Sequence, residues 1–365
     1  MIALDTALHP PAATEEIAGR TVAAHYGDPD AEYAALHTGG LLVDRSYRTR
    51  MRVSGPKAAE LVTGLVTNDV KALSPGQGQY AAALTAKGKI VADVRIFATS
   101  GSPAVVTPAA VDSLLIDAPP RAGAAWTEMV RKYVNPRIAP YRDETDALRN
   151  LGVFGLHARR IVSDATGIPA AALAPLPPYA HVAAQVDGGL VTVARVPELE
   201  YEGYELFAPA DAAPGLWSRL ANAGATRGGL AAWDVARVES GRPEWGLDID
   251  ETTIPQEANF DDLHAISYTK GCYVGQETVA RVHFRGHVNR HLRGLRFQSR
   301  DLPPFKTQLI DGTGKPVGDV RSTALSPRHG PIALGMVRRE IAAGDVITAR
   351  WADGETAAVV VALPF

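Results

Sequence analysis

The pattern of hydrophobic residues changes near residue 285, and this change limits the possible folds more than any other feature of the sequence. Up to residue 284, strand-like and helix-like segments alternate. Beyond it, short strand-like segments are separated by glycine-containing turns, as in a small β-barrel or sandwich. We therefore predict an α+β protein with α+β domains at 1–147 and 148–284 and an all-β barrel domain at 285–365.

Length and composition agree with a globular protein of several domains. The 365 residues suggest two or three domains. Hydrophobic residues make up 46% of the chain and charged residues 21%, which are ordinary globular values. The net charge of −3 excludes a polycation built for nucleic acid, although it leaves room for a local basic patch.

The cysteine content and the N-terminal residues indicate in which cellular compartment the protein is expected. Cys272 is the single cysteine, so the chain can form neither an internal disulfide framework nor a four-cysteine metal site. The first ten residues lack the cationic start and apolar run of a secretory signal. No apolar stretch approaches the roughly 20 residues that span a bilayer. We expect a cytoplasmic protein without a membrane partner.

Turn and helix signals divide both α+β domains into elements. In the first domain we expect a helix at 12–27, a strand at 47–53 followed by a helix to about residue 65, and a hairpin at 79–98. In the second domain, Asp187-Gly188-Gly189 marks a hairpin. Helices are expected at 156–165, 211–223 and 229–240.

A basic segment with regularly spaced histidines begins near residue 281. His283, His287 and His291 are four residues apart, which on a helix would resemble a metal site. Hydrophobic and basic residues alternate around them, which favours a strand with a cationic face, and nearby arginines would repel a metal ion. We expect no metal. The segment either binds an anionic partner, such as phosphate, a polyglutamate tail or RNA, or is a solvated face paired with acids.

The cysteine lies in a short glycine-flanked segment. Gly271 and Gly275 permit a tight loop around Cys272. Lys270 is close enough in sequence to favour the thiolate, which is the reactive form. A lone cysteine is more often a small buried hydrophobic residue. The residues alone leave a functional and a structural role equally open.

The same segment resembles a family signature. Lys270-Gly271-Cys272-Tyr273-Val274-Gly275-Gln276-Glu277 is similar to the Lys-Gly-Cys-Tyr-x-Gly-Gln-Glu signature of YgfZ-type folate-binding proteins, relatives of the glycine cleavage T-protein. The resemblance extends over most of the chain through further motifs. These include Asp44 and Ser46, Thr67 to Val70, Gly88 and Asp93, Arg195 and Gly203 to Glu205, Gly229 to Asp250, and Ser326-Pro327.

The resemblance implies a fold, a ligand and a role. The fold would be a ring of three domains with tetrahydrofolate or a derivative in a central hole, and the protein would support iron–sulfur cluster assembly or repair. Its partners would be folate and iron–sulfur proteins. The functional thiol loop would consist of Cys272 and Lys270 with Gly271, Tyr273, Gly275, Gln276 and Glu277. The folate-binding residues would be Asn68, Tyr80, Asp93, Arg195, Tyr201, Tyr204, Glu205 and Trp233.

Departures from the T-protein pattern bear on whether the chain is an enzyme. Tyr201 stands where the T-protein has a folate-binding glutamate, and Trp233 stands where it has an arginine. Asp112 corresponds to the catalytic aspartate only if a gap is allowed. A folate-dependent aminomethyltransferase or demethylase is therefore the alternative, and a tRNA-binding module that uses the basic segment is a third possibility.

Overall fold

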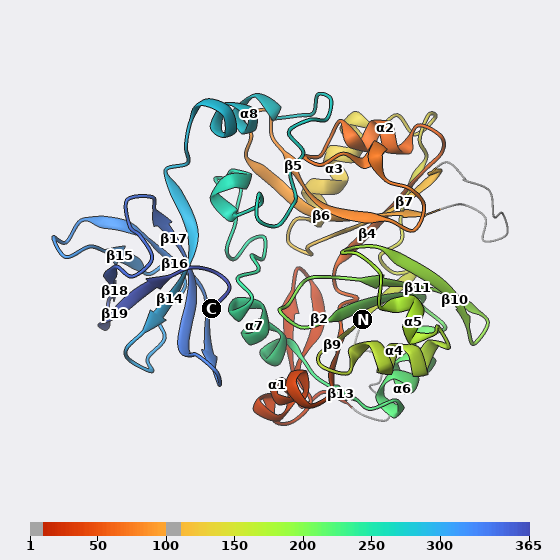
Figure 1. The fold of residues 1–365 in the computed structure, drawn as a ribbon, viewed down its shortest axis with the longest axis horizontal. Helices are drawn as coiled ribbons and strands as arrows, with labels where there is room; N and C mark the ends of the chain where they lie inside the picture. Colours follow the sequence, from red (N-terminus) through yellow and green to blue (C-terminus); the bar gives the residue numbers. More distant parts are fainter. Residues whose placement is uncertain (1–9, 100–110) are drawn as a thin grey trace.

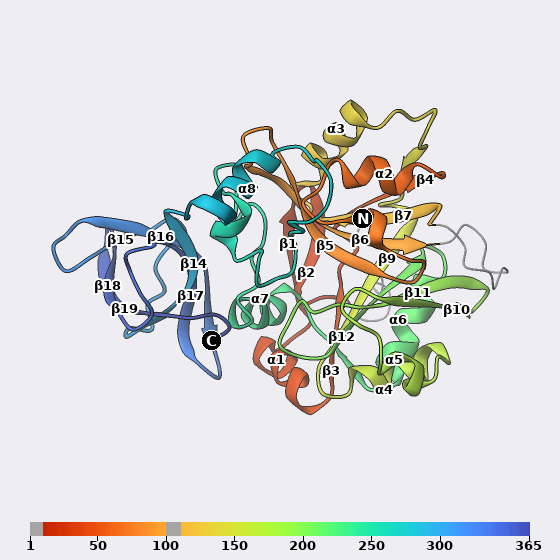
Figure 2. The same cartoon turned by 45° about the horizontal axis from the view of Figure 1, so that its top comes forward.

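The computed structural model describes residues 10–99 and 111–365. Its strands form a five-stranded sheet, a six-stranded sheet, a closed six-stranded barrel and a separate two-stranded hairpin (Figure 1). The two larger sheets lie side by side, and the barrel lies to one side of both (Figure 2). The predicted α+β class with a C-terminal β-barrel is confirmed.

The five-stranded sheet belongs to the N-terminal part of the chain and has the order β5-β6-β7-β4-β8. Its elements are β4 (Thr49–Ser54), α2 (Ala58–Thr63), η1 (Val70–Ala72), β5 (Gly78–Leu84), β6 (Ile90–Thr99), β7 (Ser113–Ala118), α3 (Gly123–Tyr133) and β8 (Tyr141–Asp143). Apolar residues of α2 and α3, among them Val62 and Trp126, pack on the sheet. The expected hairpin at 79–98 is confirmed as β5 and β6, which pair antiparallel.

The six-stranded sheet has the order β10-β11-β12-β9-β3-β13. Its elements are β3 (Gly40–Asp44), β9 (Leu148–Phe154), α4 (Ala158–Thr166), α5 (Ala170–Leu173), β10 (His181–Val186), β11 (Gly189–Arg195), β12 (Gly203–Pro209), α6 (Ala213–Asn222) and β13 (Ala225–Arg227). The predicted hairpin at Asp187-Gly188 is confirmed, because both residues have positive φ angles and join β10 to β11.

Sheet membership does not follow the expected division at residue 148. β3 comes early in the chain, yet it lies between β9 and β13 in the six-stranded sheet. The segment around residues 260–275 comes late but contacts the five-stranded sheet, where the rings of Phe260 and Tyr80 are 5.2 Å apart. The two α+β units therefore exchange segments.

Two segments differ from their expected secondary structure. The expected helix at 12–27 is wrong: β1 (Ala13–Ile17) and β2 (Arg20–His25) form a hairpin. Ala18 and Gly19 both have positive φ angles there, which a helix cannot contain. The helix formers in the segment were outweighed by this turn.

The basic segment is also different. Residues 276–285 form the helix α8 (Gln276–Arg285) rather than a strand with a cationic face. Val279 is the buried residue of α8, so the alternation seen in the sequence does not reflect burial. Gly286 ends the helix, and the barrel begins at β14 (Arg290–Phe297).

The helix α7 (Leu230–Glu239) joins the parts of the molecule. It packs on α1 (Pro29–Thr38) and β2 on one side and on strands β16 and β17 of the barrel on the other. The barrel consists of β14, β15 (Gln308–Ile310), β16 (Pro316–Ser326), β17 (Gly330–Arg338), β18 (Val346–Trp351) and β19 (Gly354–Val361). The short helix η2 (Pro255–Ala258) lies between α7 and α8 in the chain. None of the described helices is long and apolar enough to cross a membrane.

Candidate functional site

A network of buried charged side chains lies between the two large sheets. Asp117 of β7 is fully buried and accepts hydrogen bonds from Arg48 Nε at 2.5 Å and from Arg95 Nη2 at 2.7 Å. Burial alone would raise its pKa, but the surrounding guanidinium groups of Arg48, Arg95 and Arg50 outweigh burial and lower the pKa of Asp117. This carboxylate is therefore held ionised at the centre of the protein.

Glu205 of β12 extends the network into the six-stranded sheet. One of its oxygens lies 2.8 Å from Arg45 Nε and 2.7 Å from Arg95 Nη1. The other accepts a hydrogen bond from Asn150 Nδ2 at 2.6 Å. Because Arg95 belongs to β6 and Glu205 to β12, this ion pair ties the two sheets together.

Arg242 links the charges to a group of aromatic rings. Its Nη2 donates to the hydroxyl of Tyr179 at 2.5 Å and lies 3.3 Å from Glu198 Oε1. Burial opposes ionisation of Glu198, yet Arg242 and Arg95 lower its pKa to about 2. The Arg242 guanidinium also lies over the ring of Tyr80, 4.7 Å from its centroid. A cation over a ring face is favourable and fixes the orientation of Tyr80.

Asp93 of β6 is the most unusual carboxylate of this region. It accepts a hydrogen bond from the Tyr80 hydroxyl at 2.9 Å through Oδ2. Its other oxygen, Oδ1, is buried and has no hydrogen-bond partner among the described residues. Burial, with a contribution from Glu244, raises the pKa of Asp93 to about 6. A buried acceptor without a partner is costly, so this atom suits a ligand that donates a hydrogen bond.

Trp233 of α7 closes the other side of the same core. The Arg45 guanidinium lies 3.9 Å from the centroid of its ring, and Phe154 meets it edge-on. The space lined by Arg45, Tyr47 and Trp233 amounts to about 10 Å³. This is room for about one water molecule, so the Trp233 side of the core is filled by protein.

The structure brings together four of the eight predicted folate-binding residues. Tyr80 and Trp233 belong to one hydrophobic cluster. Asp93 is connected to it by the hydrogen bond from the Tyr80 hydroxyl, and Glu205 by its ion pairs with Arg45 and Arg95. Of the other four, Asn68 and Tyr201 contact the edge of this cluster, whereas Arg195 and Tyr204 do not belong to it. Asn68 bonds the backbone of Tyr80 and His264, Arg195 bonds Leu176 O, Tyr201 contacts His37 and Arg328, and Tyr204 bonds Glu202.

Tyr204 and Glu205 are adjacent in the sequence but lie on opposite faces of β12. Side chains alternate between the two faces of a strand. In β12, Glu205 points to the central network, whereas Tyr204 packs in the cluster formed with α4 and α6 on the opposite face. The resemblance selected both residues, but the pleat of the strand assigns them to different environments.

The cysteine loop lies apart from the network and is exposed. Cys272 is a free, exposed thiol. Lys270 anchors the loop, because its Nζ donates to the carbonyl oxygens of Thr63 and Val66 at 2.6 Å and of Asn68 at 3.0 Å. Burial lowers the pKa of Lys270 to about 8. Tyr273 packs under this ammonium group, and Gln276 and Glu277 begin α8.

Sequence reasoning missed most of the charged network. Its unforeseen members are Arg45, Arg48, Arg95, Asp117, Tyr179, Glu198 and Arg242. A signal was present for two of them: Asp117 is the single charge of the apolar strand β7, and Arg95 stands with Asp93 in the otherwise apolar strand β6. A charge inside a buried strand must find a partner, so these two residues could have indicated a buried ion pair, which the sequence analysis did not predict.

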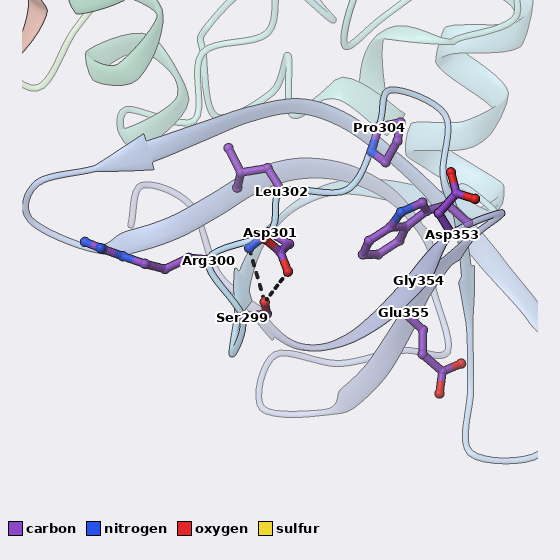
Figure 3. A pocket seen from close by; sticks show the side chains of 9 residues that line it. Ser299, Arg300, Asp301, Leu302, Pro304, Asp353, Gly354 and Glu355 are labelled. Carbon is purple, nitrogen blue, oxygen red and sulfur yellow. Dashed lines mark hydrogen bonds between the residues drawn. The ribbon is translucent and has the colours of Figure 1, made fainter.

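A separate pocket of about 540 Å³ lies in the barrel (Figure 3). Its loop is fixed by Ser299 and Asp301, where Asp301 N donates to Ser299 Oγ at 3.1 Å. Asp353 and Glu355 line the opposite part. Trp351 is also a lining residue. None of the predicted site residues lies in this pocket, so it is distinct from the central network.

Comparisons with known proteins give a consistent result. Residues 9–267 match the GCVT N-terminal domain, and residues 290–365 match the glycine cleavage T-protein C-terminal barrel domain. An aminomethyltransferase of Rubrobacter xylanophilus is 30% identical over 96% of this chain and 89% of its own length. One from Saccharopolyspora erythraea is 29% identical over 96% of this chain and 93% of its own.

A solved structure agrees at the level of the fold. The glycine cleavage system aminomethyltransferase T of Bartonella henselae superposes with a TM-score of 0.82. The superposition covers 96% of this chain and 93% of that one at 23% identity. The arrangement of sheets and barrel described above is therefore that of a known fold.

Proposed function

Because the chain belongs to the glycine cleavage T-protein family, we propose that it binds a reduced folate and takes part in folate-dependent one-carbon transfer. The relatives named aminomethyltransferase support this choice over a purely accessory role. The observation that carries the proposal is Asp93 Oδ1, a buried acceptor without a partner among the described residues.

The residues around Asp93 fit a pterin. A pterin is flat, carries N–H donors on its edge and has apolar faces. Asp93 would accept from those donors, while the rings of Tyr80 and Tyr179, which lie nearly parallel at 6.3 Å, would contact a face. The Trp233 side is filled, so we place the ligand on the Asp93 side of the core.

Asp93 also has the acid–base character that the reaction needs. A group with a pKa near the working pH can both accept and give up a proton. The pKa of Asp93 is about 6, whereas Asp117 and Glu198 are held ionised by arginines. Tyr80 orients the Asp93 carboxyl group through its hydroxyl. Tetrahydrofolate, when bound, would supply the nitrogen atoms that carry the one-carbon unit.

Calorimetry with tetrahydrofolate and 5-formyl-tetrahydrofolate tests the binding. We expect a micromolar dissociation constant, equivalent to about −8 kcal/mol. Asp93→Asn should weaken binding at least tenfold. Asp112→Asn is the matched control, because Asp112 is exposed and directly precedes β7, outside the network. Lack of saturation at millimolar folate would contradict the proposal, and loss of transfer activity in Asp112→Asn alone would move the catalytic carboxylate there.

Residues 107–110, which precede Asp112 in the segment compared with the catalytic region of the T-protein, lie outside the described residues. The assignment of a general base therefore rests on Asp93 and its contacts.

Transfer itself can be followed by ¹³C NMR with a labelled one-carbon donor. We expect the label on folate with the unaltered protein and a rate at least tenfold lower with Asp93→Asn.

Support of iron–sulfur enzymes is a second candidate, favoured by the accessible Cys272. An exposed thiol on an anchored loop could react or ligate iron, which a buried one could not. In cells that lack the protein, Cys272→Ala should restore iron–sulfur enzyme activity less well than the unaltered chain, with folate binding unchanged. Full complementation by Cys272→Ala would remove this candidate.

A further inference from the structure

A basic groove lies where the chain passes from α8 into the barrel. Figure 1 shows this connection between α8 and β14. It has a volume of about 1020 Å³ and is lined by His287, Val288, Asn289, Arg290, His291, Arg338, Arg339 and Glu340. Its walls are the start of β14 and the end of β17, which are held together by the bond from Arg339 N to Asn289 O at 3.0 Å. Glu340 is the one carboxylate among these lining residues.

The arginines of the basic groove are only partly neutralised. Arg290 and Arg338 are directly opposite each other in the antiparallel pair of β14 and β17, and like charges in such positions repel. Glu257 pairs with Arg290 at 3.1 Å, and Glu340 lies 3.5 Å from Arg338. No salt bridge involves Arg339 within residues 10–99 and 111–365. An anion in the groove would relieve this excess of positive charge.

The helix α8 continues the cationic surface and adds an aromatic ring. Arg281 and Arg285 are exposed on α8, and among the described residues neither forms a salt bridge. Phe284 is 66% exposed, which is unusual for a large apolar side chain. It lies edge-on to His283, which itself stacks on Tyr268 with 3.6 Å between ring centroids. Glu277, one turn before Arg281, is the acidic residue of the helix.

We propose that the basic groove and the adjoining face of α8 bind a single-stranded nucleic acid. The arginines would neutralise successive phosphates, and Phe284 would stack on an unpaired base. An acidic peptide would use the arginines but would gain little from an exposed ring. A duplex would use the arginines but would offer no unstacked base to Phe284. The combination of charge and exposed aromatic surface thus favours a single strand.

Fluorescence anisotropy with the full chain tests this site. The probes are a labelled 20-nucleotide pyrimidine-rich RNA, the same sequence as DNA and the matching RNA duplex, in 50 and 200 mM KCl. We expect single strands to bind more tightly than the duplex, with affinity falling about tenfold or more between the two salt concentrations. Comparison of RNA with DNA shows whether the 2′-hydroxyl contributes.

Variants separate the two parts of the site. The double variant Arg338→Glu/Arg339→Glu should lower affinity at least tenfold. Phe284→Ala should lower it about fivefold or more while leaving the salt dependence unchanged. The matched control is Arg131→Glu/Lys132→Glu, which makes the same charge change at exposed positions of α3. It should change affinity less than twofold.

Three outcomes would overturn the proposal. The first is absence of binding at 50 mM KCl. The second is an equal loss of affinity in the α3 control, which would indicate a general charge effect. The third is displacement by polyglutamate at the same charge concentration together with no effect of Phe284→Ala, which would indicate a site for anions in general. Thermal melts of each variant verify that the exposed substitutions leave the fold intact.

Discussion

At the scale of single residues, Asp93 is the group whose properties depend most on its surroundings. Its pKa is raised from 3.8 to about 6, so the folded protein holds this proton more tightly than the unfolded chain. Stability therefore falls as pH rises from about 4 to about 6, because the folded state must then carry a buried, partly unpartnered charge. At neutral pH the folded protein therefore carries this unfavourable buried charge. Carboxylates with raised pKa values are typical of functional sites.

Asp93→Asn should remove this cost while keeping an acceptor for Tyr80. We expect the variant to gain roughly 1–3 kcal/mol over the unaltered protein at pH 8 and much less at pH 4. Urea unfolding at both pH values measures the difference. A gain of equal size at both pH values would show that the Asp93 carboxyl does not titrate in this range.

Cys272 permits a simple test of accessibility. Because the thiol is exposed, a maleimide should label one site per chain in the native protein without denaturant. Cys272→Ala removes few contacts, so the free energy of unfolding should change by about 0.5 kcal/mol or less. Labelling that requires denaturant would place the thiol in the core instead.

At the scale of elements, the contact between α8 and the β5–β6 turn depends on two glycines. Gly88 and Gly275 both have positive φ, and a Cβ on Gly275 would lie 2.5 Å from Thr85 O and 3.1 Å from Gly88 Cα. Gly271, in the same loop, differs in both respects. A Cβ added there would meet no atom within 4 Å, and its φ is not positive.

Gly275→Ala should therefore destabilise the protein by about 2 kcal/mol or more, since neither the backbone angle nor the space suits a side chain. Gly271→Ala should have an effect within about 0.5 kcal/mol. Differential scanning calorimetry of the two variants gives the comparison. Equal shifts in melting temperature would contradict the assigned packing of α8 on the turn.

Helices, strands and turns were predictable where the residues of a short segment determine its conformation. Asp187-Gly188 specified a hairpin because few residues tolerate its turn angles. The strand expected in the basic segment is wrong, because Val279 is the buried residue of α8 and the alternation of hydrophobic residues there does not reflect burial. β3 was not foreseen as a strand, because four of its five residues are buried and the strand shows no alternation.

The candidate site was less predictable for a related reason. The resemblance located Tyr80, Asp93, Glu205 and Trp233 because their motifs are local in sequence. Their partners Arg45, Arg95 and Arg242 come from three distant parts of the chain, and only the pairing of strands brings them together. Tyr204 and Glu205 point to opposite faces of their strand because of its pleat. The spacing of the motif alone does not reveal this difference.

At the scale of the whole molecule, Glu205 joins the two sheets through Arg45 and Arg95. Glu205→Gln leaves two buried guanidinium groups with a weaker partner, and we expect a loss of roughly 3–5 kcal/mol. Glu355→Gln, which removes an exposed pair with Arg350, should cost less than about 1 kcal/mol. Denaturant unfolding provides both values, and a small effect of Glu205→Gln would show that the sheets are held by apolar packing alone.

The network also predicts how the protein responds to acid. The pKa of Asp117 is lowered by its arginines, and that of Glu198 is lowered to about 2. Their contribution to stability is present above about pH 4.5 and is lost as pH falls toward 2. Urea midpoints measured from pH 6 to pH 2 should therefore decrease steeply below pH 4. A flat profile would mean that these ion pairs contribute little.

The position of β3 has a consequence for synthesis on the ribosome. Its neighbours β9 and β13 begin about a hundred and about 180 residues further along the chain. At roughly 5–20 residues per second, the emerging strand waits several seconds or more for each neighbour, with its backbone groups and apolar side chains uncovered. The six-stranded sheet can close only after Arg227 has left the exit tunnel. The nascent chain therefore passes through a long stage in which a ribosome-bound chaperone would find Gly40–Asp44 exposed.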